Sequence, residues 1–145
     1  MDNVLYYETA EGAAEPQKAH KTDAGFDLFV HDCRIVQSTE GESIRRYSIA
    51  TGVSVAIPEG YVGLVLPRSS ISMAGVLTHT GVIDAGYTGF IRVFLTVFNP
   101  SFTPSIGMKI AQLVVLPLPD FTLQQGMVSA LKTERGSNGF GSTGR

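Results

Sequence analysis

The segment Ile49-Ala50-Thr51-Gly52-Val53-Ser54-Val55-Ala56-Ile57 alternates large apolar or β-branched residues with small ones at a period of two. In an extended chain this period places the larger side chains on one face and the smaller ones on the other. The segment therefore predicts a continuous β-strand with one buried face.

Three further strands are predicted at 61–66, 90–98 and 110–118, because these runs are rich in β-branched and aromatic residues. Turn-forming residues separate the runs, at Pro58-Glu59-Gly60, Asn99-Pro100, Pro104 and Gly107. Short strands with such spacing favour a β-sandwich or a closed barrel over alternating strand and helix units.

Helical periodicity is confined to one short segment, predicted as a helix around Ser70 to Ala74. Ser69 or Ser70 is the expected N-terminal cap, and Gly75 the expected end. The fold class predicted from these patterns is all-β with a single short helix.

The strand predicted at 90–98 is apolar on both faces. One face carries Phe90, Arg92, Phe94, Thr96 and Phe98, and the other carries Ile91, Val93, Leu95 and Val97. Because a chain of this size rarely contains two cores, one face is expected to cover the core and the other to meet a partner subunit. An interior strand of a thick sandwich is the alternative explanation.

Composition restricts the classes of function. The 145 residues make one domain, with 11 basic and 13 acidic side chains and a net charge of −2, which argues against a nucleic-acid partner. A single cysteine and three scattered histidines indicate neither a disulfide nor a zinc site. We find no signal-like N-terminus and no apolar run of membrane-spanning length, so the expected location is the cytoplasm or another reducing intracellular compartment.

Four internal segments carry candidate chemistry, each with a plain structural alternative. Asp27 lies among apolar residues in 24–28. It is either a buried structural carboxylate or a carboxylate that reaches a metal ion. The segment Pro67-Arg68-Ser69-Ser70 offers two hydroxyls and a guanidinium at a helix start, which can contact phosphate or form a capped turn. The segment 81–89 holds Asp84 and Tyr87 in a glycine-rich hairpin, and Gln112 is the one amide in an apolar strand.

The C-terminal stretch 135–144 is rich in glycine and serine, with Arg135 at its root and Phe140 in its middle. Such a composition is typical of a disordered terminus, but it can also wrap an anion once it is held in place. A large aromatic ring in this setting favours the second interpretation, since the ring can stack on a nucleobase.

Together the five segments, in this order and spacing, resemble the five motifs of the trimeric deoxyuridine triphosphate nucleotidohydrolases, the dUTPases. The resemblance spans roughly residues 22 to 144. It implies a distorted jelly-roll β-barrel over residues 1–132 and a flexible C-terminal arm over 133–145. It also implies a homotrimer whose three active sites lie at subunit boundaries, each closed by an arm from a neighbour.

The resemblance implies hydrolysis of dUTP to dUMP and pyrophosphate, by attack of water on the α-phosphorus, with Mg²⁺ held mainly by the three phosphates. Asp84 matches the acid that activates this water, Gln112 a water-positioning and phosphate-positioning group, and Asp27 the carboxylate that reaches Mg²⁺ through water. The residues that match substrate-binding positions are Arg68, Ser69, Ser70, Gly81, Val82, Ile83, Tyr87, Arg135, Phe140, Gly141, Ser142 and Thr143. Within this set Tyr87 matches the ring beneath the deoxyribose, and 81–83 the main chain that reads uracil.

Three alternatives compete with this interpretation. A dCTP deaminase shares the Arg-Ser-Ser motif but needs a glutamate where this chain has Phe94, which cannot transfer a proton. A regulatory protein could keep the nucleotide pocket as a dUTP-responsive switch for a protein partner whose identity the sequence does not give. A shell-forming jelly roll gives no reason for Asp84, Tyr87 or Phe140.

Thr88 departs from the family pattern, which usually has arginine there.

Overall fold

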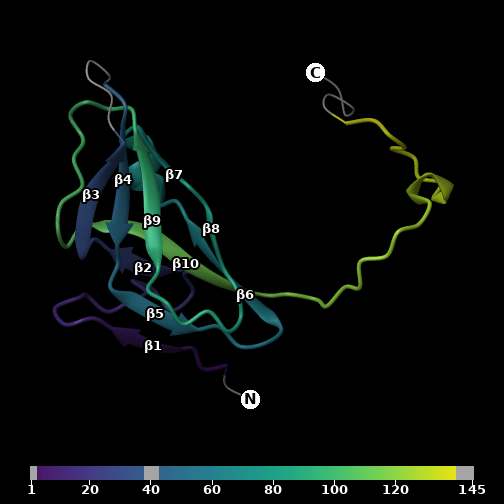
Figure 1. Cartoon of the computed structure of the whole chain (residues 1–145), viewed down its shortest axis with the longest axis horizontal. Helices are drawn as coiled ribbons and strands as arrows, with labels where there is room; N and C mark the ends of the chain where they lie inside the picture. Colours follow the sequence, from purple (N-terminus) through teal and green to yellow (C-terminus); the bar gives the residue numbers. More distant parts are fainter. Residues whose placement is uncertain (1–2, 38–42, 140–145) are drawn as a thin grey trace.

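The computed structural model describes residues 3–37 and 43–139, and within these ranges the chain is mainly β-strand (Figure 1). The elements in chain order are β1 (Tyr6–Thr9), β2 (Phe26–Phe29), β3 (Asp32–Gln37), β4 (Arg45–Ala50), β5 (Val53–Ala56), β6 (Tyr61–Leu66), α1 (Ser69–Met73), β7 (Val76–Thr78), β8 (Gly81–Ile83), β9 (Arg92–Val97) and β10 (Lys109–Pro117). A 3₁₀ turn, Val128–Ala130, follows. The all-β prediction with one short helix is confirmed.

Two antiparallel four-stranded sheets enclose the core, in the orders β2-β10-β6-β8 and β3-β4-β9-β7. β1 and β5 form a separate two-stranded sheet. One cluster of buried residues draws from both large sheets, including Leu28 and Leu113 from the first and Ile49, Leu95 and Val97 from the second. Each such fully buried side chain stabilises the fold by roughly 1.5–3 kcal/mol, so the facing sheets are held by their inner surfaces.

The continuous strand predicted over 49–57 is wrong in one respect, because the chain turns a corner inside it. Gly52 has a φ of +67°, a conformation that favours glycine, and it separates β4 from β5. The Thr51 hydroxyl donates to the Ile91 carbonyl at 2.7 Å and accepts from the Val53 amide at 3.2 Å. The large residues of the segment are all buried as predicted, although the two halves belong to different sheets.

The short helix is present, but its predicted serine cap is not. Arg68 is the N-cap residue of α1 and makes no side-chain capping bond, while Ser69 and Ser70 lie inside the helix. Gly75 ends the helix as predicted, with a φ of +80°. Both serine side chains are therefore free of the capping role that the sequence suggested.

The two faces of the predicted strand 90–98, which contains β9, differ sharply in burial. Ile91, Val93, Leu95 and Val97 are at most 1% exposed and pack in the core, whereas Phe90, Phe94 and Phe98 are about half exposed, at 50%, 48% and 51%. Thr96, on the outward side, is buried at 6%. The outward row of phenylalanines fits the expected subunit contact better than the interior strand of a thick sandwich.

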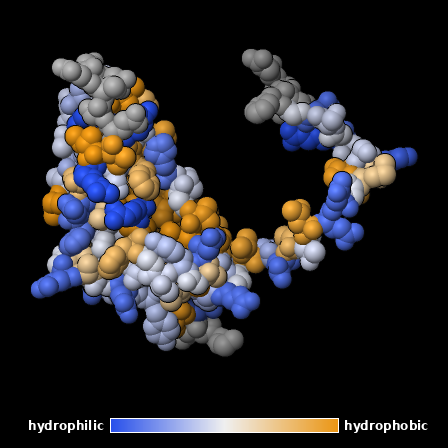
Figure 2. Space-filling model, in the orientation of Figure 1, coloured by the Kyte–Doolittle hydropathy of each residue, from blue (hydrophilic) through white to orange (hydrophobic). Residues whose placement is uncertain are grey.

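After β10 the chain leaves the barrel as an extended segment (Figure 1), and every residue from Leu116 to Gly139 is exposed. Figure 2 shows hydrophobic side chains along this segment as well as on the barrel. Among the residues described above, no helix has the length and hydrophobicity needed to cross a membrane.

Candidate functional site

The strand order β2-β10-β6-β8 brings four of the five predicted motifs onto adjacent strands. Asp27 lies on β2 and Gln112 on β10, where Gln112 is opposite both Asp27 and Leu66 of β6. The segment 67–70 follows directly after β6, and β8 is formed by 81–83. Residues far apart in the sequence therefore meet on one sheet.

Asp27 is the centre of a charged cluster. Its Oδ1 lies 3.3 Å from Arg68 Nε, and its Oδ2 lies 3.5 Å from Lys109 Nζ. The Asp27 side chain is 16% exposed, and the two cations are more open to solvent, at 27% and 41%. The carboxylate is thus held between two positive charges at the edge of the barrel.

Arg68 joins this cluster to the first turn of α1. One of its terminal nitrogens, Nη1, lies 3.3 Å from both Ser70 Oγ and the Lys109 carbonyl oxygen. The guanidinium is therefore oriented by three neighbours on three elements. Ser69 and Ser70 are exposed beside it, so their hydroxyls are accessible to a ligand.

The Gln112 side chain is held in place by a hydrogen bond from its amide and by the absence of a side chain at Gly25. Its Nε2 donates to the Pro67 carbonyl at 2.9 Å. A Cβ on Gly25 would lie 2.5 Å from Gln112 Oε1 and 3.0 Å from its Cβ, so the side chain occupies space that only glycine leaves open. The amide is thereby held next to the segment that carries Arg68 and Ser69.

Asp84 and Tyr87 lie around a different hollow, a cavity of about 340 Å³. The Tyr87 amide donates to the Asp84 carbonyl at 3.2 Å, which closes a tight turn around Gly86, where φ is +87°. The same cavity is lined by Gly81, Val82 and Ile83. The candidate nucleoside-binding residues therefore share one hollow.

Within one chain these two groups are separated. β8 runs antiparallel to β6, with Gly81 opposite Val65 and Ile83 opposite Gly63, so Asp84 lies beyond the Gly63 level while Gln112 is opposite Leu66. Three residues of strand correspond to about 10 Å. The single chain thus brings Asp27, Arg68 and Gln112 together but leaves Asp84 and Tyr87 elsewhere.

The fifth predicted motif falls partly outside the described residues. The members that lie outside are Phe140, Gly141, Ser142 and Thr143. Arg135 is described, and it lies on the extended segment. Its Nε donates to the Asn138 carbonyl at 2.8 Å and its Nη2 to the Gly139 carbonyl at 3.3 Å. In this arrangement the guanidinium bonds to its own segment, and no hydrogen bond joins it to the candidates among residues 3–37 and 43–139.

His79 lines the cavity of Asp84, but its ring has a fixed partner. Its Nε2 lies 2.8 Å from Thr96 Oγ1, and its amide donates to the Phe94 carbonyl at 2.9 Å. These contacts indicate a structural role for His79.

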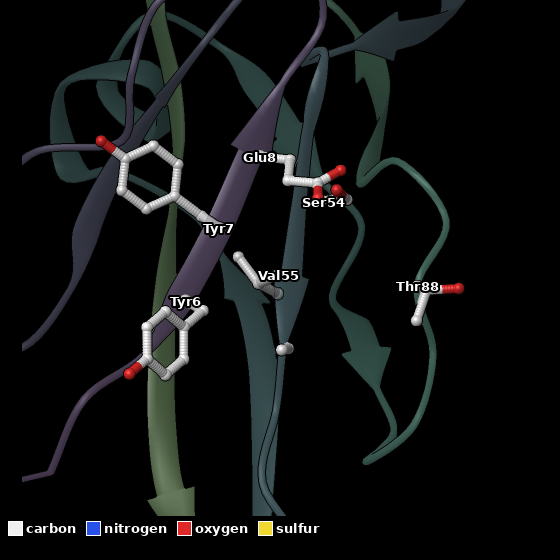
Figure 3. Close-up of a pocket in the computed structure, with 7 residues that line it drawn as sticks. Tyr6, Tyr7, Glu8, Ser54, Val55 and Thr88 are labelled. Atoms are coloured by element: carbon white, nitrogen blue, oxygen red, sulfur yellow. The ribbon is translucent and has the colours of Figure 1, made fainter.

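Thr88 is at the border of a separate cavity of about 300 Å³, which Tyr6, Tyr7, Glu8 and β5 also line (Figure 3). Desolvation and the nearby Glu15 carboxylate, which accepts a hydrogen bond from the hydroxyl, raise the pKa of Tyr7. Tyr87 and Thr88 are neighbours in sequence but line different cavities.

Sequence reasoning missed Lys109, Gly25 and Gly89. Lys109 is a cation three residues before Gln112 on the same strand, which was the available signal for a charge near Asp27. The two glycines carry no side chain, and only the structure shows what a Cβ there would strike.

Comparison with known proteins identifies the family. The dUTPase family model matches residues 11–144. A deoxyuridine 5'-triphosphate nucleotidohydrolase of Clostridium kluyveri is 38% identical over 133 residues, covering 89% of both chains. The protein of the same name from Cutibacterium acnes is 39% identical and covers 99% of this chain and 94% of its own length.

Solved structures give the same result. The dUTPase of Staphylococcus bacteriophage 80alpha with dUpNHpp has a TM-score of 0.83 and 30% identity, covering 99% of this chain and all (100%) of its own. A mutant dUTPase from phage phi11 of S. aureus, described for its coordination of a structural Mg(II) ion, has a TM-score of 0.71, 30% identity and coverage of 86% and 97%. Because the family model matches most of its length and the relatives are more than one third identical in sequence, this chain belongs to the dUTPase family.

Proposed function

We propose that this protein hydrolyses dUTP to dUMP and pyrophosphate. The observation that carries the proposal is the convergence of Asp27 on β2, Gln112 on β10 and Arg68 at the start of α1, which provides a carboxylate, a guanidinium and an amide at one edge of a dUTPase fold. This donor set suits a triphosphate with its metal ion.

The phosphate end of the substrate is bound by the group around Arg68. The guanidinium is held by Asp27 and Ser70, so it presents its remaining donors in a fixed direction. Ser69 and Ser70 contribute exposed hydroxyls, and the Gln112 amide positions phosphate and water. Fixed donors of this kind stabilise the charge that develops on the phosphoryl oxygens in the transition state.

The nucleoside end is bound around Asp84. Main-chain groups of Gly81, Val82 and Ile83 read uracil, and the Tyr87 ring packs beneath the deoxyribose. The Asp84 carboxylate accepts a proton from the water that attacks the α-phosphorus, and pyrophosphate leaves. The 340 Å³ cavity that these residues share supports this assignment, since a nucleoside needs a preformed hollow.

The residues around Asp27 fit a Mg²⁺ ion that is held through water, and they do not fit one that is held by several direct protein ligands. No cluster of three or more potential metal ligands occurs among residues 3–37 and 43–139, and Asp27 already faces two cations. Mg²⁺ keeps several waters and uses few carboxylates when phosphates supply the other ligands. We infer that Asp27 holds the ion through water, and that the ion neutralises phosphate charge when bound.

A homotrimer would complete the site. The separation of Asp84 from Gln112 within one chain, and the exposed row Phe90, Phe94 and Phe98, both support assembly of each site from more than one subunit. The C-terminal arm then closes the site, with Arg135 on the γ-phosphate, Phe140 over uracil, and Gly141, Ser142 and Thr143 around the phosphates.

Pyrophosphate release in the presence of Mg²⁺ tests the proposal, with dUTP, dCTP, dTTP and UTP assayed in parallel and the products identified. Turnover of dUTP alone to dUMP is expected. Conversion of dCTP to dUTP or dUMP would instead indicate a deaminase.

The Asp84→Asn variant tests the assignment of the base. It removes the proton acceptor but keeps the shape of the side chain, so folding and dUpNHpp binding should persist while kcat falls about 10²-fold or more. An unchanged kcat would contradict the role of Asp84.

A regulatory function is a second candidate. The bacteriophage 80alpha dUTPase is described as controlling the transfer of virulence genes by a proto-oncogenic G protein-like mechanism. We propose that dUTP binding by this chain can also control docking to a protein partner. Tight dUTP binding without turnover would favour this role over hydrolysis.

A further inference from the structure

The aromatic ring of Tyr87 lies directly against the backbone of Gly89. A Cβ on Gly89 would fall 2.5 Å from Tyr87 Cζ, 3.0 Å from Cε1, and closer still to the hydroxyl oxygen. Favourable carbon contacts lie at about 3.5–4.0 Å. The ring therefore occupies the space that a side chain at position 89 would need.

Backbone conformation does not explain this glycine. Gly86, in the same hairpin, has a φ of +87° and nothing within 4 Å of its Cβ position, so its requirement is conformational. Gly89 is not among the glycines with positive φ, so no left-handed backbone conformation requires glycine there. The requirement at Gly89 is the space taken by the Tyr87 ring.

The ring is also fixed at its far end. The Tyr87 hydroxyl donates to the Phe90 carbonyl at 3.1 Å, which places the ring across Gly89 from one side of the turn to the other. The side chain is 47% exposed, and the cavity it lines also contains Asp84. Two contacts thus set the position of the Tyr87 ring in the hairpin. One is the hydrogen bond to Phe90, and the other is the packing of the ring against the backbone of Gly89.

We propose that Gly89 is a positioning residue that determines discrimination between deoxyribonucleotides and ribonucleotides. The inference rests on the proposed role of Tyr87 beneath the sugar. A Cβ at position 89 would lift the ring from the backbone, so the ring would no longer fit against the 2′-carbon. The ring can exclude a 2′-hydroxyl and still accept deoxyribose only at its native distance from the sugar, so a displaced ring loses part of this discrimination.

The test is kcat/KM for dUTP and UTP in the wild type, Gly89→Ala, Tyr87→Ala and the double variant. In G89A the dUTP-to-UTP ratio should narrow about tenfold, the size expected for a changed steric contact. In Y87A the ratio should narrow as well, and adding G89A to Y87A should change it no further, because no ring remains to displace. A merely structural role would lower both activities and leave the ratio unchanged.

Incorporated 3-fluorotyrosine gives a readout without substrate. The Tyr87 resonance, identified by its loss in Tyr87→Phe, should shift in G89A while the other tyrosine resonances stay in place. If G89A alone is unstable, its thermal stability in the Y87A background decides the matter. Recovery in that background supports the ring contact, and equal instability in both backgrounds overturns it.

The outcomes separate this inference from the proposed function. A wild-type ratio in G89A, together with a narrowed ratio in Y87A, would overturn the role of Gly89 and leave that of Tyr87 intact. A wild-type ratio in Y87A would overturn both.

Discussion

Asp27 and Arg68 form an ion pair, with Oδ1 and Nε 3.3 Å apart, across the gap between β2 and the start of α1. Lys109 approaches the other carboxylate oxygen at 3.5 Å. Three charged groups thus share one edge of the barrel, and each is partly open to solvent. Such pairs contribute little to stability, typically 0.2–1 kcal/mol, so their main effect is on the local potential and on side-chain orientation.

Lys109→Met should increase the affinity for Mg²⁺ while leaving the fold intact. Removing a cation next to Asp27 makes the local potential more negative, so the Mg²⁺ concentration for half-maximal activity should fall roughly two- to fivefold, about 0.4–1 kcal/mol. Arg34→Met removes the same charge on β3, in the other sheet, and should leave that concentration unchanged. Equal responses in both variants would contradict a local effect at Asp27.

Gly25→Ala should lower kcat by displacing Gln112. The added Cβ would lie 2.5 Å from Gln112 Oε1 and 3.0 Å from its Cβ, so the amide cannot keep its 2.9 Å bond to Pro67. Loss of this bond should also lower the free energy of unfolding by about 1 kcal/mol. Urea unfolding at fixed protein concentration measures this change. In a Gln112→Ala background, G25A should lower the free energy of unfolding by less than it does in the wild type.

Thr51→Val should destabilise the corner between β4 and β5. Valine keeps the shape but removes the hydroxyl that bonds the Ile91 carbonyl and the Val53 amide, at a site that is 1% exposed. An unsatisfied buried backbone group costs about 1–3 kcal/mol. Thermal unfolding should show the loss for T51V, whereas Thr51→Ser retains the hydroxyl and should recover most of it.

Truncation after Lys132 should leave an assembled protein with little activity. The deletion removes Arg135 and the rest of the arm but keeps every strand of the barrel. Sedimentation should give the same oligomeric state as the full chain, while dUTP turnover falls. Full activity in the truncated protein would show that the arm is only a terminal tail, and the domain boundary predicted there stays a prediction until then.

The sequence by itself determined the fold class, the family and most of the candidate residues. Enrichment in β-branched and aromatic residues is a local property of the chain, so it predicts 61–66 with the bounds that β6 has, and the strand predicted at 90–98 contains β9. Glycines at turns were equally readable, as at Gly60 and Gly107, whose φ angles are +87° and +86°. Motif order along the chain then identified the family.

Only the tertiary structure decided how those residues meet. Continuous alternation hid the corner at Gly52, because burial keeps the same period on either side of a bend. The pairing of Asp27 with Lys109 and the separation of Asp84 from Gln112 depend on strand order and register. These relationships join distant parts of the chain, and no local periodicity encodes them.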